Sequence, residues 1–160
     1  PQGGAVQAPS FSLFRVRGDG ACMFRSIAQG VQIASGHGKP MSPDSETQAA
    51  HNLRKAVVAE LSKRRDDIEP FIPGILDGDV TFEDYLDRMA HPSAWGGEPE
   101  MVMAVHVVRM PINVWRITAA GAELIVSYGD EYKGVAPINL LWHSAGHYDL
   151  LVTSEVRGHG

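Results

Sequence analysis

The sequence of 160 residues is 44% hydrophobic and 21% charged, a balance typical of one globular domain that buries a core without disulfides or metal ions. Its net charge of −5 at pH 7 argues against nucleic acid as a partner, because phosphate contacts need a basic surface. The acidic balance suits a basic protein or a basic peptide tail instead.

Cysteine usage and hydropathy indicate the compartment. The single cysteine, Cys22, excludes an internal disulfide, so nothing in the sequence requires an oxidising environment. No apolar run approaches the ~18 residues that span a bilayer, and no signal-peptide pattern is present. We therefore expect a cytoplasmic location, with the nucleus as a second compartment, and no membrane partner. Because the sequence begins at Pro1, we also expect a domain taken from a longer protein.

The first two thirds of the chain have helical patterns. Residues 1–10 lack periodicity and are expected to be a flexible lead-in to one domain at residues 11–154, which a flexible tail at residues 155–160 follows. A short strand is expected at 11–16. Apolar residues at helical spacing, Pro43 after Ser42 and the candidate cap Thr81 predict four helices. These are expected at residues 22–34, 43–65, 82–90 and 99–110.

The last third has strand patterns. Residues 112–117 and 123–128 flank the Ala119-Ala120-Gly121 turn and predict a hairpin. Residues 138–142 and 148–153 predict two more strands, separated by a turn at 144–146. Helices followed by strands favour a segregated α+β fold in which the first helix packs against the sheet.

The segment Gly18-Asp19-Gly20-Ala21-Cys22 leads from the first strand into the first helix. A thiol at a helix N-terminus is expected to have a lowered pKa and to be nucleophilic near neutral pH. The free backbone N–H groups of Gly20, Ala21 and Cys22 are candidates for binding an oxyanion. Without this context, a lone cysteine is more often a small buried apolar residue.

A candidate base for the thiol lies at the other end of the chain. In an extended strand, residues i and i+2 point to the same side, so Asp149 is expected to reach Nδ1 of His147 and to fix its tautomer. The alternative is an ordinary strand histidine. His143 and His147 have a zinc-like spacing, but Gly146 breaks the helix that this spacing needs and no third ligand is evident, so no metal site is expected.

Three segments together resemble the ovarian tumour (OTU) family of cysteine proteases. They are Gly18–Arg25 around Cys22, the Trp95-Gly96-Gly97 segment with Ile112-Asn113-Val114 further on, and Gly146-His147-Tyr148-Asp149. They occur in the family's order, and the resemblance covers roughly residues 14–152.

The resemblance implies a papain-like α+β fold, with helices packed around a small central sheet. It implies Cys22 as nucleophile, His147 as general base and Asp149 as the acid that orients it. Asp19 belongs to the site either as a brace for the oxyanion loop, which we favour, or as a direct catalytic residue. The Trp95-Gly96-Gly97 segment would line the substrate channel, although a loop with a core tryptophan is an equal alternative.

The function implied is that of a deubiquitinating isopeptidase, which hydrolyses the bond between the C-terminal glycine of ubiquitin and a lysine. The partners implied are ubiquitin or polyubiquitin chains, and we expect a monomer without a cofactor. Two alternatives remain open: a module that binds ubiquitin without cutting it, and a protease for a ubiquitin-like modifier.

Overall fold

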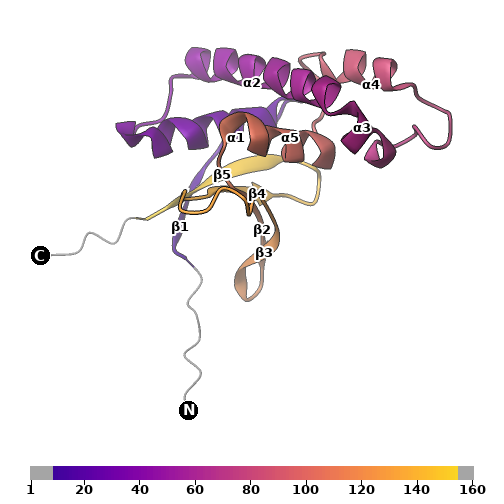
Figure 1. Ribbon diagram of the computed structural model, residues 1–160. Helices are drawn as coiled ribbons and strands as arrows, with labels where there is room; N and C mark the ends of the chain where they lie inside the picture. The colour runs from indigo at the N-terminus through magenta and orange to yellow at the C-terminus, as the bar shows by residue number, and fades with distance from the viewer. Residues whose placement is uncertain (1–8, 155–160) are drawn as a thin grey trace, which may run out of the picture.

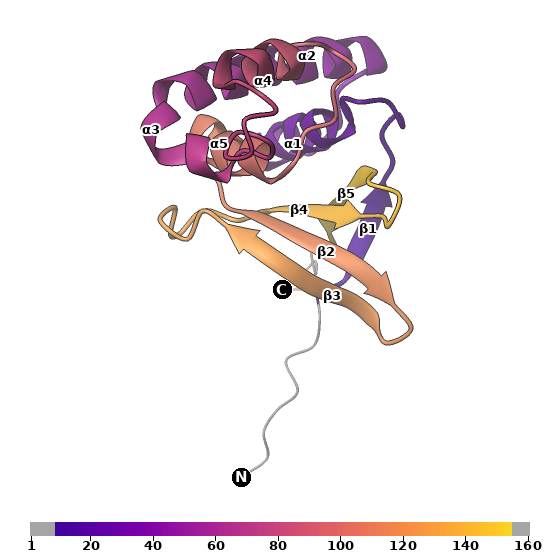
Figure 2. The same ribbon diagram turned by 90° about the vertical axis from the view of Figure 1, so that its right-hand side faces the viewer.

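The computed structural model describes residues 9–154. Residues 1–8 of the lead-in expected at 1–10, and the whole tail expected at 155–160, lie outside the described residues. A layer of helices covers one face of a five-stranded sheet (Figure 1; Figure 2). The α+β fold expected from the sequence is confirmed, with the helices gathered on one side of the sheet. Among the described helices, none is both long and apolar enough to cross a bilayer.

The helices begin where their capping residues predict. Ser42 and Thr81 accept hydrogen bonds through their side chains from the backbone N–H of Ser45 and Asp84. These bonds satisfy donors that would otherwise lack a partner in the first helical turn. The helical elements are α1 (Cys22–Gln32), the π-helical turn η1 (Ile33–His37), α2 (Pro43–Lys63), α3 (Arg65–Ile68), the 3-10 turn η2 (Glu69–Phe71), α4 (Phe82–Met89) and α5 (Glu98–Val108).

The sheet joins the first described strand to the last one. Its order is β1-β5-β4-β2-β3, and the pairings are antiparallel except for β2 with β4. Because β1 runs antiparallel to β5, the chain leaves β1 for the cysteine segment at the end of the sheet where it enters β5. The strands are β1 (Phe11–Phe14), β2 (Ile112–Thr118), β3 (Gly121–Tyr128), β4 (Ile138–Trp142) and β5 (Tyr148–Thr153).

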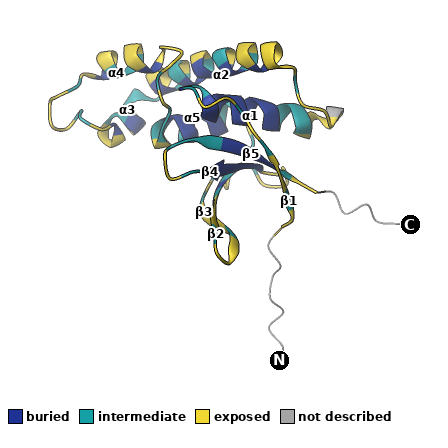
Figure 3. Ribbon diagram, turned by 180° about the vertical axis from the view of Figure 1, so that it is seen from behind, coloured by how far each residue is buried: buried dark blue, intermediate teal, exposed yellow. Residues whose placement is uncertain are grey.

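Helix α1 is the central element of the core. It lies between α2 and the sheet, and its residues 22–30 are all buried, whereas the outer sides of α2 and α4 face solvent (Figure 3). Gly30 permits the close approach of α1 to the sheet, since a Cβ there would lie 2.7 Å from Cγ2 of Ile138. The cysteine at the start of α1 is therefore held by the best-packed part of the molecule.

The core predicts a large contrast between two identical substitutions. Leu61 on α2 is fully buried, whereas Leu76 is 80% exposed. We expect Leu61→Ala to lower the free energy of unfolding by about 2–5 kcal/mol, because it removes buried methyl groups and leaves a cavity. Leu76→Ala should change it by less than about 0.5 kcal/mol. Urea denaturation of both variants tests this, and equal losses would contradict the packing described for α2.

Candidate active site

Cys22 is the first residue of α1, after Ala21 at the N-cap position. Its side chain is 1% exposed. The sulfur accepts a hydrogen bond from the backbone N–H of Tyr148 at 3.5 Å, across 126 positions of sequence. The thiol is therefore in direct contact with the first residue of β5, which follows His147 in the chain.

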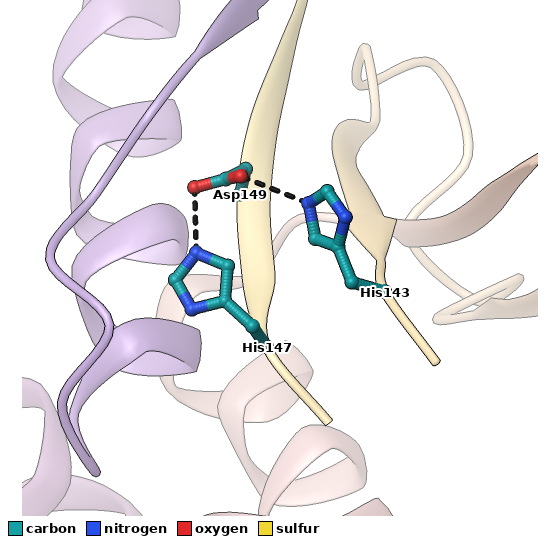
Figure 4. Close-up of side chains that lie close together, drawn as sticks. All are labelled: His143, His147 and Asp149. Atoms are coloured by element: carbon teal, nitrogen blue, oxygen red, sulfur yellow. Dashed lines mark hydrogen bonds and ion pairs between the residues drawn. The ribbon is translucent and has the colours of Figure 1, made fainter. Parts of the chain in front are cut away.

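His147 and Asp149 form the pair expected from the sequence, but through the other ring nitrogen. The Nε2 of His147 lies 2.8 Å from Oδ1 of Asp149 (Figure 4). The sequence-based expectation of Nδ1 is wrong, because His147 precedes β5 and its ring turns the far nitrogen toward the carboxylate. Nδ1 is buried and has no hydrogen-bond partner among the described residues. That nitrogen can accept a proton.

Asp149 accepts three hydrogen bonds. Oδ1 also accepts from the backbone N–H of Val16 at 2.9 Å, and Oδ2 accepts from Nε2 of His143 at 2.9 Å. Burial acts to raise the pKa of this carboxyl, but the N–H donors of Val16, His147 and His143 outweigh it and lower the pKa. Asp149 therefore stays ionised although it is only 4% exposed.

His143 is a site residue that sequence reasoning missed. Its backbone N–H donates to the carbonyl of His147 at 2.9 Å, and its carbonyl accepts from the N–H of Gly146 at 2.8 Å. These two bonds close a tight turn that brings both imidazoles to Asp149. The spacing of the two histidines in the sequence fits a helix as well as a turn, and only the turn brings both of them to Asp149. The turn that the sequence predicts at 144–146, between the two histidines, is the signal that identifies this arrangement.

The electrostatics at Cys22 differ from the sequence-based expectation. Burial raises the pKa of the thiol, and the charges of Asp19 and Asp149 raise it further. The N–H groups of Tyr148 and Met23 act in the opposite direction but do not outweigh burial. The thiol is therefore protonated at rest near neutral pH, and it needs a base rather than the helix terminus alone.

Asp19 contacts the loop rather than His147. Its Oδ1 accepts from the backbone N–H of Ala21 at 3.1 Å, and both of its oxygens accept from the Arg25 guanidinium at 3.2 and 2.9 Å. Arg25 is buried and also reaches Glu46 at 3.3 Å and Thr47 at 2.9 Å on α2. These contacts match the bracing role favoured from the sequence.

The three candidate oxyanion donors are not equivalent. The N–H of Ala21 is already donated to Asp19 Oδ1, and the N–H of Cys22 makes a 3.2 Å turn bond to the carbonyl of Asp19. The N–H of Gly20 makes no hydrogen bond within the described part of the chain. The N–H of Gly20 is therefore a free candidate donor, whereas the N–H groups of Ala21 and Cys22 would each have to give up a hydrogen bond to bind an oxyanion.

Arg54 on α2 is a second residue that sequence reasoning missed. It is 1% exposed, and its guanidinium donates to the carbonyls of Gly20 at 3.2 Å, Pro92 at 3.0 Å and Met89 at 3.1 Å. It also stacks on the Phe24 ring at 4.4 Å. One buried cation thus fixes the cysteine loop to the segment that leads to Trp95.

The Trp95-Gly96-Gly97 segment lies beside α1. A Cβ at Gly96 would come within 2.6 Å of Cε of Met23, the flexible end of that side chain, so the segment passes close to the helix. Trp95 is 52% exposed and lines a cavity of about 780 Å³ with Gly97 and side chains of α3, α4 and α5. The tryptophan is therefore not a core residue, which removes the alternative considered from the sequence.

A buried thiol at a helix start, in contact with the residue that follows a histidine held by a carboxylate, matches the arrangement of a cysteine hydrolase. The family model for OTU-like cysteine protease matches residues 17–149. The chain belongs to this family.

Two curated relatives and two solved structures illustrate the similarity. OVARIAN TUMOR DOMAIN-containing deubiquitinating enzyme 4 of Arabidopsis thaliana is 39% identical over 147 residues, which are 91% of this chain and 44% of the relative. Deubiquitinase OTUD6B of Gallus gallus is 31% identical over 144 residues, 84% of this chain and 43% of the relative. The chain thus spans less than half the length of both.

Among solved structures, the OTU domain of OTUD1 matches with a TM-score of 0.70 at 22% identity, covering 89% of this chain and 85% of that one. An OTU domain in complex with ubiquitin matches with a TM-score of 0.63 at 25% identity, covering 91% and 71%. The OTU fold expected from the sequence is confirmed.

The contacts of Arg54 predict a loss of folding stability on substitution, which lysine at the same position does not fully restore. Arg54→Met should lower stability by roughly 1–3 kcal/mol for each buried carbonyl left without a donor. Arg54→Lys should recover only part of this, because one ammonium group does not reproduce the planar fork that meets three carbonyls. Arg64→Met is the matched control: Arg64 pairs with Glu60 near the surface, where an ion pair contributes about 0–1 kcal/mol. Equal losses for the two methionine variants would contradict this role of Arg54.

The contacts of Asp19 predict a pH-dependent contribution to stability. Burial acts to raise its pKa, but Arg25 and the N–H of Ala21 outweigh burial and lower it. A lowered folded-state pKa means that the stabilisation is present above the ordinary carboxyl pKa of about 3.9 and is lost as pH falls through the lower folded value. Asp19→Asn should therefore be less stable than the parent at pH 7, and the gap should narrow below about pH 4. Urea denaturation at several pH values tests this, and a gap independent of pH would contradict it.

Proposed function

We propose that this domain is a deubiquitinating cysteine isopeptidase, which hydrolyses the bond between the C-terminal glycine of ubiquitin and a lysine. The observation that carries the proposal is the contact of the Cys22 sulfur with the N–H of Tyr148, between His147 and Asp149 in the chain. Residues from the two ends of the domain thus form one cluster that contains a nucleophile, a base and an orienting acid.

The first chemical step uses the free ring nitrogen. Nδ1 of His147 takes the proton of the Cys22 thiol, and the sulfur attacks the carbonyl carbon of the ubiquitin C-terminal glycine. The carboxylate of Asp149, 2.8 Å from Nε2, stabilises the imidazolium that forms. General-base removal of the proton suits a thiol whose pKa is raised by burial.

The tetrahedral intermediate places a negative charge on the former carbonyl oxygen. The free N–H of Gly20 is the first donor proposed for it, and the N–H of Cys22 becomes a second when it gives up its turn bond to the carbonyl of Asp19. One such donor contributes roughly 2.7–4 kcal/mol to transition-state stabilisation. Gly20 is suited to a tight loop because a Cβ there would lie 1.9 Å from the carbonyl oxygen of Ser93. The Asp19–Arg25 and Arg54 contacts hold this loop in place before the substrate arrives.

The intermediate collapses when the imidazolium of His147 donates its proton to the leaving lysine amine. This step leaves a thioester between Cys22 and ubiquitin. His147 then activates a water that hydrolyses the thioester and restores the thiol. In each half-reaction His147 acts once as a base in its neutral form and once as an acid in its protonated form.

The choice of ubiquitin as substrate is supported by the relatives. The Arabidopsis thaliana relative is named as a deubiquitinating enzyme, and one similar OTU domain was solved in complex with ubiquitin. The cavity beside Trp95 is lined by exposed apolar side chains such as Phe71, which suits a protein substrate. A ubiquitin-like modifier is the second candidate, and parallel cleavage assays with each modifier distinguish the two.

The proposal predicts a graded series of active-site variants. Cys22→Ala should abolish cleavage of a fluorogenic ubiquitin substrate, because no nucleophile remains. His147→Ala should reduce turnover strongly, and Asp149→Asn should reduce it less, since an orienting acid is not consumed in the reaction. His51→Ala, which changes a histidine on α2, should leave turnover close to the parent value.

Two outcomes would contradict this series. Full activity of Cys22→Ala would exclude the nucleophile, and equal losses in His147→Ala and Asp149→Asn would exclude an orienting-only acid. A ubiquitin suicide probe with a C-terminal electrophile separates enzyme from binding module, because only a reactive sulfur forms the adduct. Thermal denaturation of each variant confirms that the fold is retained.

A further inference from the structure

The cluster at the start of β5 has the composition of a metal site. His143, His147 and Asp149 each offer one ligand atom, and these atoms all lie within 4.8 Å of one another (Figure 4). The sequence predicts no metal site, because Gly146 breaks the helix that the histidine spacing needs and no third ligand is evident. The turn at 144–146 and the first residues of β5 bring that ligand to them.

The donor set fits a borderline divalent cation. Two imidazole nitrogens and one carboxylate oxygen are ligands that zinc accepts, and a catalytic-type zinc site has three protein ligands and one open position. Zinc ligand distances of about 2.0–2.2 Å require the ligand atoms to be about 3.3 Å apart. Nε2 of His143 lies 2.9 Å from Oδ2 of Asp149, and Nε2 of His147 lies 2.8 Å from Oδ1, so each imidazole is close to its own carboxylate oxygen. A small rotation of the side chains would bring both rings to one cation, because the three ligand atoms already lie within 4.8 Å of one another.

The surroundings would orient the ligands and admit a cation. Asp149 is fixed by the N–H of Val16, and the backbone N–H of His143 is bound to the carbonyl of His147. The side chain of His143 is 41% exposed, whereas that of Asp149 is 6% exposed. A cation would therefore enter from the His143 side and find two of its ligands held by backbone hydrogen bonds.

We propose that His143, His147 and Asp149 bind one zinc-class divalent cation reversibly, and that the bound cation switches off the base of the cysteine site. Binding follows from the three ligands alone. The inhibitory effect rests on the proposed function, because it requires His147 to act on Cys22.

The bound cation inhibits the reaction by changing which nitrogen of the His147 ring carries the proton. A cation on Nε2 of His147 replaces the proton that this nitrogen donates to Asp149. The neutral ring then carries its one proton on Nδ1, which is the nitrogen that takes the thiol proton in the proposed reaction. No net protonation is needed, only a change of tautomer, and Nδ1 is no longer an acceptor while the cation stays bound.

The binding experiment uses Cys22→Ala protein, which keeps all three ligands and removes the thiol. Calorimetric titration with Zn²⁺, and visible absorption with Co²⁺ as a spectroscopic probe, should show one equivalent bound. Adding His143→Ala to this background should weaken binding roughly tenfold or more, the scale on which supporting groups of metal sites already act. His143→Gln is the second variant, since an amide can still donate to Asp149 but is a poor zinc ligand. His51→Ala on the same background is the matched control and should bind like its parent.

Two results would overturn the site: loss of binding in Cys22→Ala protein, which would assign the cation to the thiolate, or parental affinity in both His143 variants. Inhibition is measured separately on the Cys22 protein, where Zn²⁺ should reduce cleavage and His143→Gln should raise the half-inhibitory concentration roughly tenfold or more, as its affinity loss requires. An equal half-inhibitory concentration in the parent and His143→Gln would overturn the inhibitory role. If the Cys22 protein cleaves no ubiquitin substrate, the proposed function and the inhibition fail together, while the binding result stands on its own.

Discussion

The hydrogen bond from the N–H of Val16 to Asp149 is the contact on which the site depends. It extends the β1–β5 pairing by one polar link beyond the last paired residues, Phe14 and Leu150. On one side of this link the chain runs on to Cys22, and on the other it carries His147. A buried carboxylate needs several donors to remain ionised, and this backbone donor is independent of either histidine. The strand pairing that closes the sheet therefore also holds the acid that orients the base.

Two carboxylates near a buried thiol disfavour the ionised form of that thiol. Both Asp19 and Asp149 act to raise the pKa of Cys22, so a resting thiolate is disfavoured. Each carboxylate is instead matched to a cation or a donor set of its own. Asp19 is paired with Arg25, and Asp149 is bound by Val16 and the two histidines. The negative charge of the sulfur is thus favourable only while His147 carries a proton, which couples formation of the nucleophile to the base.

Local signals in the sequence were sufficient for most of the secondary structure. Strands β4 and β5 begin and end at the residues predicted on either side of the turn at 144–146, and the caps Ser42 and Thr81 start their helices. These features depend on residues within a few positions of one another. The order of the strands in the sheet could not be predicted in this way. It depends on contacts between apolar faces of segments that lie far apart in the sequence.

The site residues also divide into those that short local motifs identify and those that depend on contacts distant in the sequence. The Cys22, His147 and Asp149 positions were identified from short motifs. Arg54 was not, because its three acceptors are backbone carbonyls at Gly20, Met89 and Pro92, and a carbonyl has no sequence signature. The ring nitrogen of His147 was assigned wrongly for a related reason, since the turn before β5 decides it and strand periodicity does not.

The contacts of Arg54 also connect the cysteine loop to the segment that precedes Trp95. Its Nη2 donates both to the carbonyl of Gly20, in the cysteine loop, and to that of Pro92, in the segment before Trp95. Gly20 and the carbonyl of Ser93 are in contact so close that no side chain fits between them. A displacement of the Trp95 segment would therefore pull on the peptide that precedes Ala21. One buried guanidinium thus couples the position of Gly20, which carries a candidate oxyanion donor, to that of the segment before Trp95.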